Sequence, residues 1–290
     1  MTVAWGKWGE EDERGALNHI QPEQVRAAAA LVREGVVISL AQPLFPGMMM
    51  PEHRPGLMHF MDRDGGDYAA GARAPGGFKF SEDSVVMPLH VGTHIDALCH
   101  CWYGDELYNG FPANEIRSTR GASRCGVDKI SPIFTRGILL DFVHLEGQPL
   151  ADGDSIGLDR VKAALDHAGT DVKAGDAVLL RTGWLERQRN GDKPDYNREP
   201  GIDLEAAEYL AVNGAAVIGA DNFAVEVLPF VPGTIFPVHQ LLIRDFGIPL
   251  MEGLVLAQLA QHGRGDFLFS TAPLPVRGGT GSPIVPVAVL

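Results

Sequence analysis

The sequence has little cysteine, no long apolar run and a shortage of positive charge. Its three cysteines, Cys99, Cys101 and Cys125, are an odd number at low density among 290 residues, which argues against a disulfide framework and fits a reducing compartment. No apolar segment approaches the roughly 20 residues that cross a bilayer, and the opening MTVAWGKWGEEDERG turns acidic where a signal peptide would become apolar. We therefore expect a cytoplasmic protein that does not enter a membrane.

The charge balance excludes a further class of function, the binding of nucleic acid. Lys and Arg number 24 against 37 Asp and Glu, which gives a formal net charge of −13. That charge repels phosphate backbones and anionic membranes, and no basic stripe offsets it, so we expect a small-molecule substrate rather than nucleic acid.

Strand-like and helix-like segments alternate along the chain, which indicates an α/β fold with a mixed sheet. The 45% of hydrophobic residues can form a large core, and no linker or repeat divides the chain, so we expect a single domain over residues 1–290. The patterns predict helices over residues 21–33, 158–169 and 204–214, and strands over residues 36–44, 137–143, 177–184, 215–222, 266–274 and 283–290. Residues 45–80 are irregular and rich in Gly, Pro and Met. We expect them, within an extended N-terminal section of residues 1–80, to fold over a site.

The stretch HVGTHIDALCH, residues 90–100, holds three of the ten histidines of the chain. His90, His94 and Asp96 share one parity, so an extended strand would present all three on one face. A straight strand would place the first two Cα atoms about 13 Å apart, too far to share one ion. The chain must therefore bend, and Gly92 tolerates the backbone angles that a bend requires. We expect a bent strand that leads into a loop or a short helix.

The residue types of this stretch are those of a catalytic metal site. Neutral imidazole and carboxylate groups suit zinc, manganese or iron, and three protein ligands leave positions open for water or substrate. His100, four residues beyond Asp96, projects over the same site if a helical turn starts there, where it is placed to act as acid and base. The alternative, ordinary core or surface histidines, would bury several polar groups without partners.

The same stretch resembles the signature His-x-Gly-Thr-His-x-Asp-x-x-x-His of the cyclase family of metal-dependent hydrolases, which includes bacterial kynurenine formamidase and isatin hydrolase. VLLRTGW, VIGADNFAVE, HQLLIRDFGIPLMEGL and GGTGSPIVPVAVL are similar to family segments in the same order. The resemblance implies a three-layer β/β/α arrangement of the swivelling type and a homodimer or higher homo-oligomer. It implies an arylformamidase-like or isatin hydrolase-like enzyme that cleaves an amide or lactam carbon-nitrogen bond with metal-activated water.

The resemblance also assigns roles to individual residues of the chain. It makes His100 the catalytic proton shuttle, and it adds two later residues to the site. VHQLLIRDF fits a short helix and GIPLME a strand that returns its terminal carboxylate to the metal. One or two divalent ions, Zn²⁺ or Mn²⁺, would then be held by His90, His94, Asp96, His239 and Glu252.

The substrate side of the site is less marked in the sequence. The chain is longer at its front than the smaller formamidases, and Trp5, Trp8, His59 and Tyr68 are candidates to line a pocket for a planar or amide-bearing ligand. Asp221 ends an expected strand, where site residues often lie, although a turn-forming role is the alternative. Two other functions stay open: a metal-dependent cyclase or dehydratase acting on a carbonyl without attack by water, and a metal- or ligand-binding protein without turnover.

Overall fold

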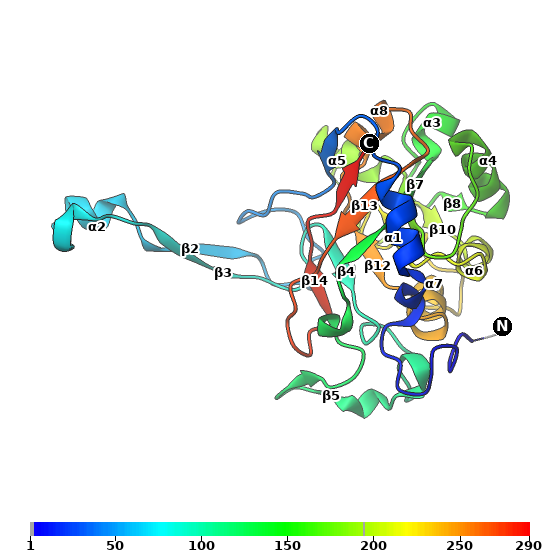
Figure 1. Cartoon of the computed structure of the whole chain (residues 1–290), viewed down its shortest axis with the longest axis horizontal. Helices are drawn as coiled ribbons and strands as arrows, with labels where there is room; N and C mark the ends of the chain where they lie inside the picture. The colour runs from blue at the N-terminus through cyan, green and yellow to red at the C-terminus, as the bar shows by residue number, and fades with distance from the viewer. Residues whose placement is uncertain (1–2, 194) are drawn as a thin grey trace.

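The computed structural model describes residues 3–193 and 195–290, and a nine-stranded mixed sheet runs through its body (Figure 1). Parallel pairing joins β7, β9, β11 and β12 at the centre, and antiparallel pairs complete both sides. In spatial order the strands are β1 (Val37–Ser39), β15 (Val287–Val289), β13 (Asp266–Thr271), β7 (Ile133–Asp141), β9 (Ala177–Arg181), β11 (Val217–Ala220), β12 (Leu250–Glu252), β4 (His94–Asp96) and β14 (Gly281–Pro283). The expected single α/β domain with a mixed sheet is confirmed, while the three-layer β/β/α arrangement stays a prediction.

The central strands are buried because helices and loops cover them. All four residues of β11 are buried, as are the first four of β9, which is typical of parallel strands covered on both faces. Helix α1 (Pro22–Ala29) packs on β7 and β13, α4 (Leu158–Ala168) packs on β7, and α6 (Leu204–Val212) packs on α4. Strand β12, which lies between β11 and β4 in the sheet, is therefore next to a well-packed core.

The predicted elements exist, but several are shorter than expected. The first helix ends at Ala29 instead of continuing to residue 33, because the backbone N–H groups of Glu34 and Gly35 donate to the carbonyl of Leu290 as the chain turns into β1. The strand expected over residues 177–184 ends at Arg181, and α5 begins at Trp184. The remaining elements are η1 (Gly15–His19), η3 (Tyr108–Gly110), η4 (Ala113–Glu115), β5 (Ile116–Arg117), β6 (Gly121–Ala122), η5 (Val127–Lys129), α3 (Phe142–Glu146), β8 (Ser155–Ile156), α5 (Trp184–Arg189), β10 (Gly201–Ile202), α7 (Pro237–His239), η6 (Gln240–Asp245) and α8 (Ala257–Gln261).

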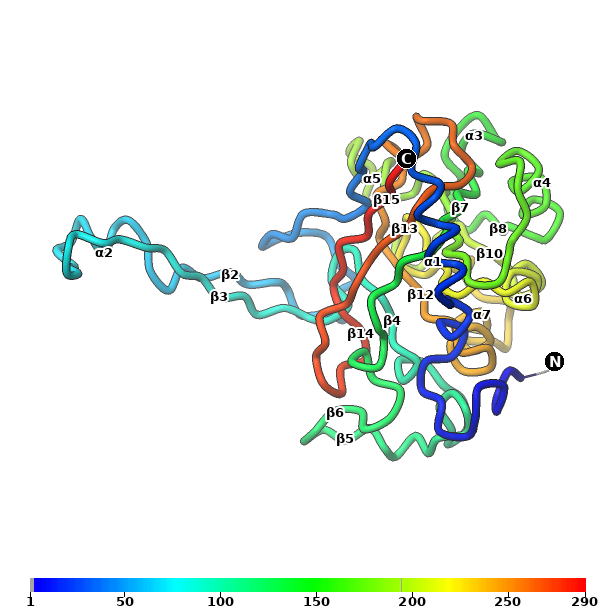
Figure 2. Tube along the Cα trace, in the orientation of Figure 1, coloured from blue at the N-terminus to red at the C-terminus, as the bar shows by residue number. Residues whose placement is uncertain are grey.

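The expected loop over residues 45–80 is mostly a hairpin that leaves the body. β2 (Met58–Arg63) pairs with β3 (Glu82–Val86) in antiparallel register, and α2 (Gly65–Ala69) and η2 (Pro75–Gly77) lie between them. Figures 1 and 2 show this hairpin projecting far from the rest of the chain, with α2 at its outer end. Only the segment before it, residues 51–54, lines the cavity of the site. Residues 58–80 thus point away from the site of their own chain, and the predicted cover over the site stays a prediction. No helix within the described residues is long and apolar enough to span a bilayer.

Candidate metal centre

The chain bends at Gly92, as the sequence predicts. Gly92 has a φ of +56°, and a Cβ at this position would lie 2.7 Å from Leu44 Cδ2, so both the backbone angle and the available space favour glycine. The bend brings His90 back toward the start of β4, where His94 and Asp96 are buried.

Strand pairing and a short helix add the two later residues to the site. Glu252 is the antiparallel partner of His94 across β12 and β4, so the two side chains lie on the same face of the sheet. Their closest atoms, Glu252 Oε2 and His94 Nε2, are 3.0 Å apart. His239 ends α7, and its Nε2 lies 3.4 Å from Glu252 Oε1 and 4.0 Å from Asp96 Oδ2. The expected helix and strand around these residues are thus present.

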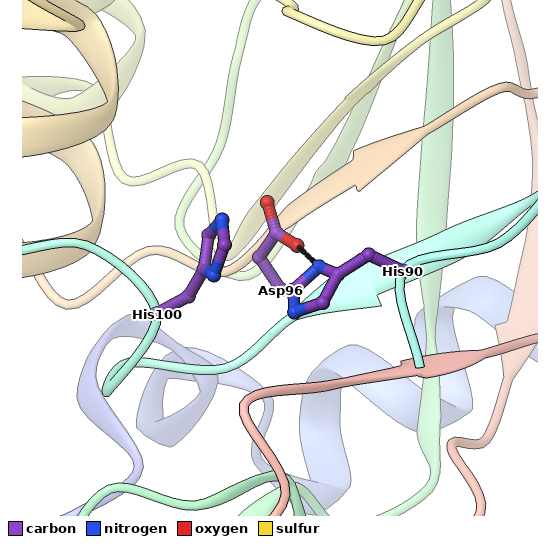
Figure 3. A group of neighbouring side chains, drawn as sticks. All are labelled: His90, Asp96 and His100. Atoms are coloured by element: carbon purple, nitrogen blue, oxygen red, sulfur yellow. Dashed lines mark ion pairs between the residues drawn. The ribbon is translucent and has the colours of Figure 1, made fainter. Parts of the chain in front are cut away.

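His90, Asp96 and His100 form a second group around the same aspartate (Figure 3). His90 Nδ1 lies 2.6 Å from Asp96 Oδ1, and the rings of His90 and His100 have centroids 4.2 Å apart. In this group, and in the group of Asp96, His239 and Glu252, the donor atoms lie within 4.8 Å of one another. The structure therefore brings together the four residues that the sequence pattern singled out and the two, His239 and Glu252, that the family resemblance added, with Asp96 common to both groups.

Buried polar atoms at this point have no hydrogen-bond partner within the described part of the chain. They are His90 Nδ1, His94 Nε2 and both carboxylate oxygens of Asp96. The close approach of His90 to Asp96 thus lacks the direction of a hydrogen bond. Buried polar groups are nearly always paired, and four unpaired nitrogen and oxygen atoms that converge on one another are the donor set of a divalent cation. The residues present therefore fit a metal ion.

The ligand histidines are oriented by hydrogen bonds on their far sides. His94 Nδ1 lies 3.0 Å from the carbonyl oxygen of Gly92, and His239 Nδ1 lies 2.6 Å from Glu226 Oε1. Because a carbonyl and a carboxylate accept hydrogen bonds, each Nδ1 carries the hydrogen, and each Nε2 presents a lone pair to the site. Such supporting groups fix ring orientation and raise the basicity of a ligand.

Burial and neighbouring charges set the proton affinities of the site. Burial alone would raise the pKa of Asp96, but the neighbouring His100, His90 and His94 hold it well below the usual range. Burial lowers the pKa of His100 to about 4, so its imidazole is neutral at physiological pH. Burial also opposes protonation of His239, yet hydrogen bonds to Glu226 and Glu252 raise its pKa well above the ordinary value, so a metal ion bound at Nε2 would displace a proton from that nitrogen. A carboxylate and a neutral imidazole are the forms that bind a metal or accept a proton.

A cavity of about 940 Å³ opens beside these groups, and His100, His239 and Glu252 line it. Residues 51–54, 195–197 and 199 form further parts of its wall. Four aromatic side chains are part of the lining, Tyr196, Phe223, Phe230 and Phe236. A substrate of small-molecule size can therefore reach His100 and the metal-binding face of the site.

The two tryptophans expected in the pocket lie elsewhere. Trp5 donates from Nε1 to the carbonyl oxygen of Arg244 at 2.8 Å, and the Arg244 guanidinium lies over its ring. Trp8 meets the ring of His19 edge-on, with centroids 5.1 Å apart. Within the described residues, neither tryptophan lines the cavity. Both tryptophans pack against other parts of the body, and their contact with substrate stays a prediction.

His59, Tyr68 and Asp221 are likewise outside the described lining of the cavity. His59 and Tyr68 belong to the projecting hairpin, where His59 pairs with Asp83 at 2.6 Å. Asp221 is buried, and it accepts hydrogen bonds from Thr182 N and Oγ1 and from the N–H of the next residue. It therefore ties the end of β9 to the end of β11, while its predicted contact with substrate stays a prediction.

Sequence patterns missed several residues of the cavity wall. Glu199 is 1% exposed, and its Oε2 accepts hydrogen bonds from the backbone N–H groups of Phe223 and Ala224. Burial raises the pKa of Glu199 to about 8. Arg54 donates from Nη1 to the carbonyl oxygen of His90 at 2.7 Å. No local spacing singles out either residue, because each reaches the site from an irregular segment far away in the sequence.

Comparison with known proteins agrees with this geometry. A model of the protein family described as "Putative cyclase" matches residues 38–227, which is more than half of the chain. The chain belongs to the cyclase family. Another structure described as a novel cyclase has 35% sequence identity, covers 100% of both chains and superposes with a TM-score of 0.93.

Two more distant members of this comparison carry functional descriptions. The isatin hydrolase of Roseibium aggregatum is 29% identical over 224 residues, which cover 73% of this chain and 75% of that protein. A structure described as a potential metal-dependent hydrolase with cyclase activity has 20% identity and a TM-score of 0.56, and the match covers 87% of this chain and 98% of the other. Relatives of this chain are therefore described as hydrolases. The likeness to the second protein, at 20% identity, shows only that the two chains share a fold.

Proposed function

We propose that this member of the cyclase family is a metal-dependent hydrolase that cleaves an amide or lactam carbon-nitrogen bond. The observation that carries the proposal is the convergence of unpaired buried donor atoms on Asp96 beside a cavity with aromatic walls. The description of a relative as isatin hydrolase supports the same reaction class. His90, His94, Asp96, His239 and Glu252 would hold one or two divalent ions, Zn²⁺ or Mn²⁺.

The chain's own groups perform proton transfer and orientation. A bound divalent ion supplies Lewis acidity, which lowers the pKa of water and polarises a carbonyl oxygen. His100, neutral and at the cavity wall, takes the proton of the attacking water and returns it to the leaving nitrogen, so that nitrogen does not depart as an anion. Because His100 lies close to His90 and Asp96, it could also serve as a metal ligand. The metal content of His100→Ala distinguishes this role from proton transfer.

The cavity favours a planar substrate. Tyr196 and Phe223 meet edge-to-face with centroids 5.6 Å apart, and both rings also contact Trp184. Phe223 lies in addition 6.1 Å from the ring of His94. Aromatic side chains arranged in this way offer flat apolar surfaces to a ring close to the reacting centre. We therefore propose aryl amides and fused lactams, as in arylformamidases and isatin hydrolases, as the substrate class.

The test combines metal content with turnover. Wild type, His94→Ala and a control, His167→Ala on the exposed surface of α4, would be purified without chelator and assayed with isatin and N-formylkynurenine. We expect wild type and the control to contain metal and hydrolyse one of the compounds, and His94→Ala to do neither. Full activity of the metal-depleted wild type would contradict the proposal.

Labelled water separates hydrolysis from the cyclase or dehydratase alternative. Only hydrolysis must place a solvent oxygen in the acid product, so mass analysis after turnover in oxygen-18 water distinguishes the two. We also propose that the protein works in the cytoplasm. The free thiols of Cys99, Cys101 and Cys125 support that compartment.

A further inference from the structure

Arg54 carries a permanent positive charge in the wall of the cavity, and no other lysine or arginine is among the described lining residues. The acidic side chains of the same wall are Glu52, Asp195, Glu199 and Glu252. In a chain of net charge −13, these carboxylates repel an anionic ligand. Apart from a bound metal ion, Arg54 is therefore the group that attracts a negative charge into the cavity.

The protein itself uses one part of the Arg54 guanidinium and holds it in place. Nη1 donates to the carbonyl oxygen of His90 at 2.7 Å. The backbone N–H of Arg54 donates to the carbonyl oxygen of Pro51 at 3.0 Å, and the following Pro55 restricts the backbone angles of Arg54 further. A side chain that is already oriented loses less entropy when it binds a ligand.

The edge of the guanidinium formed by Nε and Nη2 is free. Within the described residues, neither nitrogen donates a hydrogen bond and no carboxylate pairs with Arg54. The Nε atoms of Arg14 and Arg160 also lack a partner, but they are sealed from solvent. Nε and Nη2 of Arg54 are not among such sealed atoms. Both donors of this edge are therefore open to a ligand.

Two other arginines of the chain show what this edge binds. Nε and Nη2 of Arg136 donate to the two carboxylate oxygens of Asp176 at 3.0 and 2.6 Å. The same two atoms of Arg181 donate to the carboxylate of Glu186 at 2.7 and 2.8 Å. Two parallel charge-assisted hydrogen bonds of this kind match the planar geometry of a carboxylate. Arg54 thus presents the same edge at the cavity without a carboxylate of the described chain.

The charge of Arg54 acts on both the aromatic wall and the metal centre. Burial raises the pKa of Tyr196 to about 12, the charge of Glu199 adds to the rise, and the charge of Arg54 opposes it. Burial opposes protonation of His94, contacts with Glu252 raise its pKa overall, and the charge of Arg54 opposes that rise. An anion bound to Arg54 is therefore close to the aromatic wall and to the metal centre.

We propose that Arg54 is a specificity-determining residue that binds a carboxylate of the substrate through Nε and Nη2. The inference rests on the proposed hydrolase function, and it narrows the substrate class to aryl amides or lactams that carry a carboxylate in addition to the scissile bond. The carbonyl then faces the metal centre, the ring packs against Tyr196 and Phe223, and the carboxylate pairs with Arg54. Three separate points of attachment fix the orientation of the scissile bond.

A binding experiment that needs no turnover tests the contact. Benzoate and benzamide have nearly the same shape, but only benzoate is an anion. Calorimetric titration of each compound compares wild type with Arg54→Gln, which lacks the charge, and with Arg54→Lys, which keeps the charge and can still donate to the carbonyl of His90. The matched control, Arg33→Gln, removes one positive charge from the exposed surface outside the described cavity lining. Metal content and thermal unfolding are measured on every variant.

We expect wild type and the control to bind benzoate on the order of 10–100-fold more tightly than benzamide, because hydrogen bonds between charged groups contribute an affinity of this size. Arg54→Gln should lose this preference, and Arg54→Lys should retain only part of it, since an ammonium lacks the two parallel donors. A wild type without the preference would overturn the proposal. So would a preference that survives in Arg54→Gln, because the carboxylate would then bind at the metal centre instead.

Steady-state kinetics test the same contact on a substrate. The compounds are formanilide and the 2-, 3- and 4-formamidobenzoates, which add a carboxylate at different positions of one ring. In wild type, we expect kcat/KM of at least one formamidobenzoate to exceed that of formanilide on the order of 10–100-fold, through a lower KM. Arg54→Gln should abolish this advantage. Formanilide as the best substrate of wild type would overturn the proposal. If wild type hydrolyses none of these compounds, or isatin or N-formylkynurenine, the proposed function fails, and the benzoate titration still decides whether Arg54 binds a carboxylate.

Discussion

Replacing Glu226 by glutamine removes one charge behind a proposed metal ligand while keeping the size of the side chain. Glu226 is 1% exposed, its Oε1 lies 2.6 Å from His239 Nδ1, and it also accepts hydrogen bonds from the backbone N–H groups of Val238 and His239. A neutral amide oxygen is a weaker acceptor for His239 Nδ1–H, so the imidazole becomes a poorer donor at Nε2. We expect Glu226→Gln to bind metal more weakly while it still folds.

The expected size of the effect follows from these contacts. Groups that orient a ligand histidine typically change metal affinity 10–100-fold when they are altered, which corresponds to about 1.4–2.7 kcal/mol. Stability without metal should fall as well, because the amide NH₂ of the variant would face the N–H of Val238 in place of the acceptor now at 3.2 Å. One such unsatisfied buried donor costs about 1–3 kcal/mol.

Competition for Zn²⁺ against a chromophoric chelator measures the affinity, and urea unfolding in excess chelator measures the stability of the metal-free protein. Asp203→Asn is the control, since Asp203 also caps a helix by accepting from Ala206 N, but at the start of α6 and outside the metal centre. We expect its zinc affinity to equal that of wild type. Equal zinc affinity of Glu226→Gln and wild type would refute the reasoning that this carboxylate tunes His239.

Three further changes test other parts of the site. Gly92→Ala should lower the free energy of unfolding by about 2–4 kcal/mol, because the residue has positive φ and its new Cβ would meet Leu44 Cδ2. In the same urea titration, the control Gly147→Ala measures the cost of the positive φ alone, because this residue has a φ of +71° and no described atom within 4 Å of the new Cβ. His100→Ala should keep the wild-type metal content and lower kcat by about 10²–10⁴; loss of metal would make His100 a ligand instead. Burial raises the pKa of Glu199 from 4.5 to about 8, so the folded state binds the extra proton and stability falls as pH rises between these values. The urea midpoint of Glu199→Gln should therefore decline less than that of wild type from pH ~5 to ~8. An equal decline of the midpoint in both proteins would exclude Glu199 as the cause.

The centre of the site could be predicted from the sequence because its residues are close in the chain. Parity placed His94 and Asp96 on one face, and the need to bring His90 back to them predicted a bend at Gly92. Both inferences use only the geometry of a short extended segment. His239 and Glu252 needed the family resemblance, because no local pattern connects residues that lie more than 140 positions away from Asp96.

There are physical reasons why the projecting β2–β3 hairpin and the cavity wall could not be predicted from the sequence. Residues 58–63 and 82–86 pair with each other and not with the main sheet, so they lack the clear apolar alternation of a strand with one buried face. Trp5 resembles a pocket residue in the sequence, but the position of Arg244 decides that it packs instead. Only the tertiary fold brings Glu199 to the cavity wall, because it places this acid from an irregular segment against the backbone of Phe223.

The register of three short strands is as much a part of the metal centre as its side chains. β4 lies between β12 and β14, so Glu252 faces His94 on one side and Gly281 faces Asp96 on the other. A slip of one residue in β12 would turn Glu252 to the opposite face of the sheet. On the β14 side, a Cβ at Gly281 would lie 2.5 Å from His90 Cε1, and the preceding Thr280 places its Oγ1 3.0 Å from His90 Nε2.

The Gly-Thr-Gly segment at the start of β14 therefore shapes the site directly. Glycine at position 281 leaves the volume that the His90 ring occupies, and threonine at position 280 contacts its outer nitrogen. Because β14 pairs with β4 through Asp96, both effects act on the aspartate that the two donor groups share. The segment that completes the sheet edge thus also fixes the position of His90, although the contacting residue, Thr280, follows His90 by 190 positions in the sequence.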